Sequence, residues 1–140
     1  PAAYWVVMGN QASDADSIIT AICMAYLTRH QLQAAGGAEP GWAEAGTIVL
    51  PMVQCPREDF CLRAETVALL RGAGLTEELL TFGGNATDDA LSDGDLRKLQ
   101  AEGRLRLTLV DHNAMTPRQQ KLKLPEAVVR RPFPRQHSNS

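Results

Sequence analysis

Residues 6–17 read VVMGNQASDADS, an apolar run that stops at Gly9 and is followed by two carboxylates, Asp14 and Asp16. A short apolar run bounded by glycine is typical of a buried strand, and the loop after such a strand often carries a ligand site. Carboxylates one residue apart can face the same space, and Mg²⁺ and Mn²⁺ prefer oxygen ligands. The alternative is structural, because Asp and Ser also suit the first turn of a helix. The motif therefore indicates a hard-cation site or a helix start.

The rest of the chain alternates strand and helix patterns. Apolar, β-branched runs predict strands at residues 4–8, 47–53 and 105–110. Helical spacing of apolar residues predicts helices at 17–33, 63–72 and 88–102, and residues 77–82 are ambiguous between the two. This order predicts one α/β domain with a parallel sheet, whose right-handed crossovers bring the loops after the strands to one edge.

Local signals refine these elements. The helix at 17–33 is expected to bury one broad face that includes Cys23, Tyr26 and Leu27. Pro51 suits a sheet edge or a strand end better than a central position, because proline cannot donate to a strand ladder. Gly74 is expected to end the helix at 63–72.

A second carboxylate follows a second predicted strand. Residues 107–113 read LTLVDHN, so Asp111 comes directly after an apolar run. If this strand and the one at 4–8 are neighbours, then Asp14, Asp16 and Asp111 meet at one edge of the sheet. Carboxylates that close repel one another unless a cation lies between them. The alternatives are that Asp111 caps a turn and that His112 is a surface or capping histidine.

These two motifs together resemble a known family. Gly9-Asn10-x-x-x-Asp14-x-Asp16-Ser17 with Val110-Asp111-His112-Asn113 is similar to the DHH phosphoesterase superfamily, in its exopolyphosphatase and Prune branch. Family II inorganic pyrophosphatases share the plan but carry histidine where this chain has Asn10. The resemblance covers residues 4–128 and implies the N-terminal part of a DHH domain, a three-layer parallel α/β sandwich that is truncated here.

The resemblance also implies a chemistry. Asp14, Asp16 and Asp111 would be ligands of two Mg²⁺ or Mn²⁺ ions, with Asp111 between the two ions. Asp111, His112 and Asn10 would be the catalytic residues, Asn10 lying where related pyrophosphatases have a histidine ligand. A water activated by two metals would attack phosphorus in a phosphoanhydride. Polyphosphate, pyrophosphate or a nucleoside polyphosphate would be the substrate.

The chain departs from the family after residue 128. An Asp-His-His motif is expected about twenty residues after Asp111 and is not found, and residues 129–140 read VRRPFPRQHSNS. Residues 118–140 carry six of the fourteen Lys and Arg residues and a single acidic residue, Glu126. We expect a basic, poorly ordered tail at 129–140, an incomplete ligand set, impaired turnover and an exposed sheet edge.

Composition narrows the function classes. The 140 residues suffice for one domain, and no apolar run approaches the roughly 18 residues of a membrane span. An aromatic share of 5% argues against a stacking surface for nucleic acid. Three cysteines without metal-ligand spacing fit a reducing, cytoplasmic location. The alternative function is a catalytically inactive regulatory module that binds a protein partner; a Rossmann-type nucleotide binder is disfavoured because no G-x-G-x-x-G follows the first strand.

Overall fold

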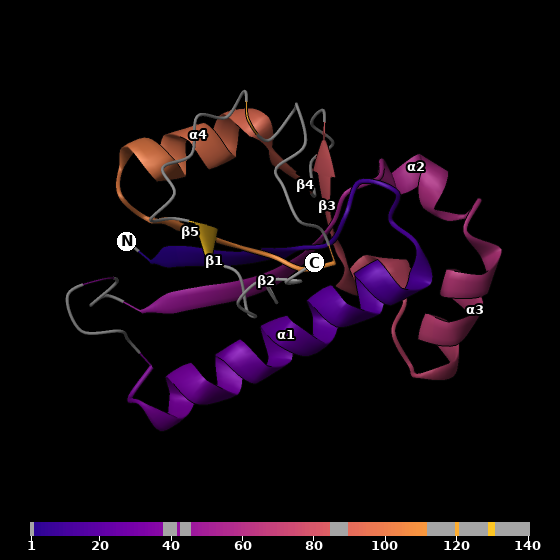
Figure 1. Cartoon of the computed structure of the whole chain (residues 1–140), viewed down its shortest axis with the longest axis horizontal. Coiled ribbons are helices and arrows are strands. Elements are labelled where there is room, and N and C mark those ends of the chain that lie inside the picture. Colours follow the sequence, from indigo (N-terminus) through magenta and orange to yellow (C-terminus); the bar gives the residue numbers. More distant parts are fainter. Residues whose placement is uncertain are drawn as a thin grey trace, which may run out of the picture.

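The computed structural model (Figure 1) describes residues 2–37, 42, 46–84, 90–111, 120 and 129–130. Within them the strands form one sheet, made of β1 (Ala3–Met8), β2 (Thr47–Val53), β3 (Thr81–Gly84), β4 (Ala90–Ser92), β5 (Leu105–Leu109) and β6 (Val129–Arg130). The strands lie in the order β4-β3-β2-β1-β5-β6, and each neighbouring pair is parallel. The predicted parallel α/β sheet is confirmed, and β1 and β5 are neighbours.

Helices cover both faces of this sheet. They are α1 (Ala15–Ala34), α2 (Arg57–Phe60), α3 (Ala64–Gly72) and α4 (Asp93–Ala101), with a 3₁₀ turn η1 at Glu77–Leu79. Figure 1 shows α1 along one face and α4 along the other, with α2 and α3 near the end of the sheet where α1 begins. The three-layer sandwich implied by the family resemblance is therefore present.

Strand β1 is buried on both faces. Val6 and Met8 pack with Leu96 and Leu99 of α4, whereas Val7 packs with alanines of α1. A strand covered on both faces reads as a continuous apolar run rather than an alternating one. This double burial explains why residues 6–8 are all apolar, and it fixes the position at which the chain leaves the sheet after Met8.

Helix α1 buries a narrower stripe than predicted. Its buried residues are Ser17, Ile18, Ala21, Ala25, Thr28 and Leu32, and from Ile18 onward they are spaced three or four apart. Tyr26 is 67% exposed, Leu27 is 48% exposed and Cys23 is exposed, so their predicted burial is wrong. The physical reason is that α1 has the sheet on one side only, and the alanines in its stripe let the helix lie close to the strands.

Helix α4 begins later than predicted. Ser92 caps it in a capping box, in which Ser92 Oγ accepts from the Asp95 N–H at 3.1 Å and the Ser92 N–H donates to Asp95 Oδ2 at 2.9 Å. Residues 90–92 are strand β4, paired with β3, where a helix was expected. The predicted start at Asp88 lies outside the described residues. The spacing of apolar residues could not locate the start of this helix. Widely spaced leucines fit a continuous helix as well as a short strand followed by a helix cap.

Other boundaries follow local chemistry. Gly74 has φ +78°, and the Leu75 N–H donates to the Leu70 carbonyl at 2.8 Å, so glycine ends α3 as predicted. The ambiguous segment 77–82 divides into η1 and the start of β3. Strand β2 is interior, which contradicts an edge position, yet β3 pairs only with Met52 and Val53 and leaves Pro51 beyond that pairing.

The predicted poorly ordered tail and the predicted exposed sheet edge concern parts of the chain with little or no description. Residues 131–140 lie outside the described residues, so the poorly ordered tail stays a prediction. Val129 pairs with Leu107 as part of β6, at the β5 edge of the sheet. Within the described part of the chain, no helix has the combination of length and apolar character needed to cross a bilayer.

Candidate metal centre

Three carboxylates meet at the ends of β1 and β5. Asp14 is the N-cap of α1, Asp16 lies in the first turn of α1, and Asp111 follows β5. Met8 pairs with Leu109, and the Val110 N–H donates to the Met8 carbonyl at 2.9 Å, so the two strands end side by side. One carboxylate oxygen from each aspartate lies within 4.8 Å of the others, and all three residues are exposed. The pairing of two strands thus gathers aspartates about 100 positions apart in sequence.

Capping does not account for Asp14. Its backbone is extended, with φ −74° and ψ 170°, as expected of an N-cap residue. Its side chain nevertheless accepts no capping hydrogen bond from the first turn. The helix N-terminus still favours negative charge through the aligned backbone dipoles, which offsets part of the repulsion between Asp14 and Asp16. The carboxylate of Asp14 is therefore not used to cap α1.

The loop between β1 and α1 is tightly built. A Cβ atom on Gly9 would lie 2.2 Å from Ser17 Oγ, which is far inside van der Waals contact. The Asn10 N–H donates to the same Ser17 Oγ at 2.5 Å, and Ser17 is fully buried. Only glycine allows this approach. The contact fixes where the loop starts relative to the first turn of α1.

Asn10 connects the two strand ends. Its Nδ2 donates to Asp111 Oδ2 at 2.9 Å, and its Oδ1 accepts from the Ser13 N–H at 3.1 Å. The backbone N–H of Ser13 fixes which end of the amide is oxygen, since the amide nitrogen could not accept there. The amide nitrogen of Asn10 therefore orients the Asp111 carboxylate, while its oxygen is engaged within the loop.

Two residues at the site adopt left-handed backbone conformations. Ser13 has φ 53° and Asp111 has φ 57°. Serine rarely adopts this region, whereas aspartate tolerates it better, and backbone strain of the kind at Ser13 concentrates at functional sites. Both residues lie in the loops that carry or precede the aspartates. Left-handed backbone thus occurs at both strand ends, at or beside the clustered aspartates.

Side chains from the segment after β2 form hydrogen bonds with the loop between β1 and α1. Gln54 Nε2 donates to the Gly9 carbonyl at 3.0 Å, and Arg63 Nε donates to the Ser13 carbonyl at 2.9 Å. Cys55 is buried near Ser13, and burial raises the pKa of its thiol, with the Arg63 guanidinium opposing part of that shift. No motif in the sequence marks Gln54, Cys55 or Arg63 as parts of the site. The available signal was position, because they follow the strand next to β1.

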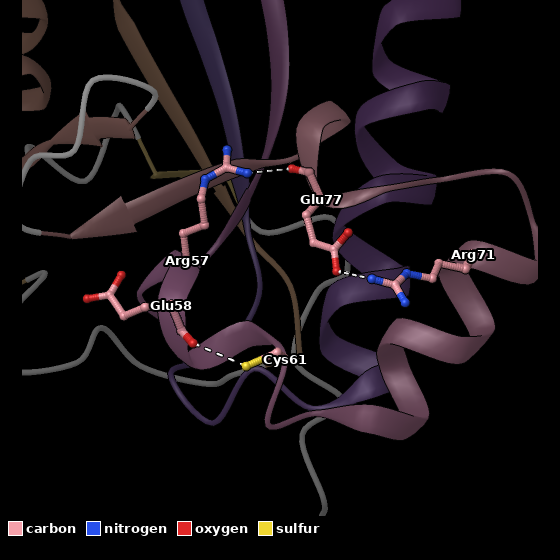
Figure 2. Close-up of polar contacts among 5 residues, drawn as sticks. All are labelled: Arg57, Glu58, Cys61, Arg71 and Glu77. Atoms are coloured by element: carbon pink, nitrogen blue, oxygen red, sulfur yellow. Dashed lines mark hydrogen bonds and ion pairs between the residues drawn. The ribbon is translucent and has the colours of Figure 1, made fainter.

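Arg57, in the same segment after β2, makes contacts that hold neighbouring elements together. Figure 2 shows Arg57 of α2 donating to the Glu77 carbonyl, at 2.8 Å, while the Glu77 carboxylate pairs with Arg71 of α3. The guanidinium carbon of Arg57 also lies 4.6 Å from the centre of the Phe82 ring. These contacts join α2, η1, α3 and β3. His112, predicted as a catalytic residue, lies outside the described residues.

Known proteins with similar sequences were found. No family model matches the chain. The exopolyphosphatase PRUNE1 of Rattus norvegicus is 32% identical over 111 residues, which are 79% of this chain and 20% of the relative. The exopolyphosphatases PRUNE1 of Bos taurus and Homo sapiens are each 27% identical over 134 residues, 94% of this chain and 25% of each relative. The chain thus spans a fifth to a quarter of the length of these relatives. These similarities confirm, at the level of the family, that the chain is related to the exopolyphosphatase and Prune branch of the DHH phosphoesterases.

Proposed function

We propose that this chain carries a divalent-metal centre for phosphoanhydride hydrolysis, with Asp14, Asp16 and Asp111 as its carboxylate ligands. One observation supports the proposal above the others. Oxygens of these three side chains lie within 4.8 Å of one another at the edge where parallel sheets commonly bind ligands. The related proteins are named exopolyphosphatases, which favours inorganic polyphosphate, pyrophosphate or a nucleoside polyphosphate as the substrate class.

The donor set fits a hard cation. Three carboxylates offer oxygen atoms only, and oxygen-only sites suit Mg²⁺ and Mn²⁺ rather than softer metals. Without a cation the three negative charges repel one another, a cost that a divalent ion removes. The Asn10 amide holds Asp111 in place for this task through its 2.9 Å hydrogen bond.

The ions would supply Lewis-acid activation of a water and charge stabilisation on the phosphoryl oxygens. The protein's own part is to hold the carboxylates in register and to keep Asp111 oriented. His112, which follows Asp111 directly in the sequence, is proposed to contact the substrate or support Asp111. We further propose that turnover by this chain alone is slow, because the three carboxylates gathered within the described residues offer fewer ligands than two octahedral ions require.

The function is tested by phosphate release from tripolyphosphate with Mg²⁺ or Mn²⁺. The proposal expects a release rate that is low, is abolished by a chelator, and is abolished by Asp111→Asn. Glu65→Gln is the matched control, since Glu65 is an exposed carboxylate in the first turn of α3 and is not a member of the aspartate cluster. Release that persists with chelator present would refute the proposal.

A second function has one observation in its favour. Tyr26 and Leu27 are large apolar side chains that α1 leaves exposed, which is typical of an interaction surface. A catalytically inactive module that binds a protein partner would retain this surface and would not need the aspartates. The two functions separate in the same assay, because the interaction module predicts that Asp111→Asn changes neither metal binding nor phosphate release.

A further inference from the structure

Arg63 joins helix α3 to the loop that carries the aspartates. Its Nε donates to the Ser13 carbonyl at 2.9 Å, and its Nη2 donates to the Ala12 carbonyl at 3.0 Å. Its Nη1 donates to the Asp59 carbonyl at 3.3 Å, which ties the side chain to the end of α2. One guanidinium therefore holds two successive carbonyls of the β1–α1 loop against α2 and α3.

The chemistry of this contact requires arginine. Two adjacent carbonyl oxygens need donors with fixed spacing, and the planar guanidinium provides them in one rigid fork. A lysine carries the same charge on a single, flexible nitrogen. Ser13 itself is 1% exposed and has φ 53°, so its carbonyl direction is set by a backbone conformation that the surrounding contacts must maintain.

Arg63 reaches the metal ligands by two short routes. Ser13 precedes Asp14 directly, so the position of the Ser13 carbonyl controls the position of Asp14 at the start of α1. The Ser13 N–H also donates to Asn10 Oδ1, and Asn10 Nδ2 donates to Asp111 Oδ2. The first route is covalent and the second consists of two hydrogen bonds. Together they connect one arginine to aspartates from both strand ends.

We propose that Arg63 is a positioning residue for the metal centre. This inference rests on the proposed function, since it assumes that the three aspartates bind a divalent cation. The charge of Arg63 has the opposite effect on metal affinity, because a positive charge near the loop disfavours the binding of a cation. The positioning effect and the charge effect therefore have opposite signs, which makes the role of Arg63 measurable.

The test is Mn²⁺ binding to the full chain, measured by electron paramagnetic resonance at a temperature where circular dichroism shows each variant folded. Arg63→Gln removes both the charge and the fork. Positioning predicts that it weakens Mn²⁺ binding by about tenfold, the lower end of the range for residues that orient metal ligands. A charge effect alone predicts tighter binding. Arg63→Lys retains the charge and loses the fork, and it should also weaken binding.

Arg71→Gln is the matched control. Arg71 lies on the same helix, is 61% exposed at its side chain and pairs with Glu77 rather than with the loop, as Figure 2 shows. Its removal should leave Mn²⁺ affinity within twofold of the unmodified chain. Figure 2 also shows that Arg57 donates to the Glu77 carbonyl.

Three results would overturn the inference. Unchanged or tighter Mn²⁺ binding by Arg63→Gln would leave no positioning effect. Equal weakening in Arg71→Gln would trace the effect to the general loss of an arginine on α3. If circular dichroism finds no temperature at which either Arg63 variant is folded, Arg63 has a purely structural role. Failure of the unmodified chain to bind Mn²⁺ is a different result, since it refutes the proposed function on which the inference rests.

Discussion

Asn10 and Asp111 are 101 positions apart in the chain and are joined by a 2.9 Å hydrogen bond from Asn10 Nδ2 to Asp111 Oδ2. The contact joins the loop after β1 to the loop after β5. It exists because these two strands are parallel neighbours that end together, with Met8 opposite Leu109. It orients one aspartate of the proposed centre by a residue from the loop that carries the other two.

The first prediction concerns this contact. Asn10→Ala removes the donor to Asp111 and the acceptor for the Ser13 N–H, and it should weaken Mn²⁺ binding by about tenfold. Isothermal titration calorimetry measures the change. Gln11→Ala is the matched control, because Gln11 is exposed in the same turn. Equal affinity of the Asn10 and Gln11 variants would contradict a role for Asn10 in orienting Asp111.

The second prediction concerns the close approach at Gly9. A Cβ there would lie 2.2 Å from Ser17 Oγ, so Gly9→Ala should lower the free energy of unfolding by about 1–3 kcal/mol, the usual cost of overpacking. Urea unfolding followed by circular dichroism measures it.

Gly72→Ala provides the comparison for this measurement. Gly72 ends α3, and a Cβ there would meet nothing within 4 Å. The substitution should raise the free energy of unfolding by about 0.4–1 kcal/mol, since alanine restricts the unfolded chain more than glycine does. Similar effects of the two substitutions would mean that the Gly9 contact with Ser17 is not tight.

The third prediction concerns the pH dependence of stability through the α4 cap. Hydrogen bonds from the Ser92 side chain and backbone hold the pKa of the Asp95 carboxyl below its ordinary value of 3.8. Because the folded-state pKa is the lower one, the contribution is present above the unfolded pKa and is lost as pH falls through the folded pKa. Thermal melts between about pH 5 and pH 3 measure this loss.

Two variants isolate that effect. Asp95→Asn removes the titrating group, so its melting temperature should fall less steeply with acidification than that of the unmodified chain. Ser92→Ala removes the side-chain partner and should flatten the same profile. Identical slopes for the unmodified chain and both variants would show that the capping box does not contribute in this pH range.

Much of the site could be predicted because apolar runs that end in carboxylates are local signals. The runs before Gly9 and Asp111 predicted two parallel strands, and the sheet order makes them neighbours. Their adjacency brings Asp14, Asp16 and Asp111 together at the edge that was expected. The apolar residues at 6–8 predicted a buried strand, which the burial of β1 on both faces confirms, whereas the adjacency of the two strands was a condition of the prediction.

Contacts between distant segments could not be predicted in this way. Gln54 and Arg63 hold the aspartate loop from the segment after β2, and nothing in their local sequence indicates a partner 45 to 50 residues away. Burial on α1 was overestimated at Cys23, Tyr26 and Leu27 for a related reason. A helical period gives the spacing of apolar residues, whereas the width of the buried face depends on what packs against the helix.

Mn²⁺ titration of the full chain by electron paramagnetic resonance shows whether Asp14, Asp16 and Asp111 form one metal centre. We expect saturable Mn²⁺ binding that Asp14→Asn and Asp111→Asn each weaken by at least about tenfold, because each removes a charged ligand from the same ion. Glu65→Gln should leave the titration unchanged. Binding that is absent in the unmodified chain, or that survives both aspartate substitutions, would contradict the claim.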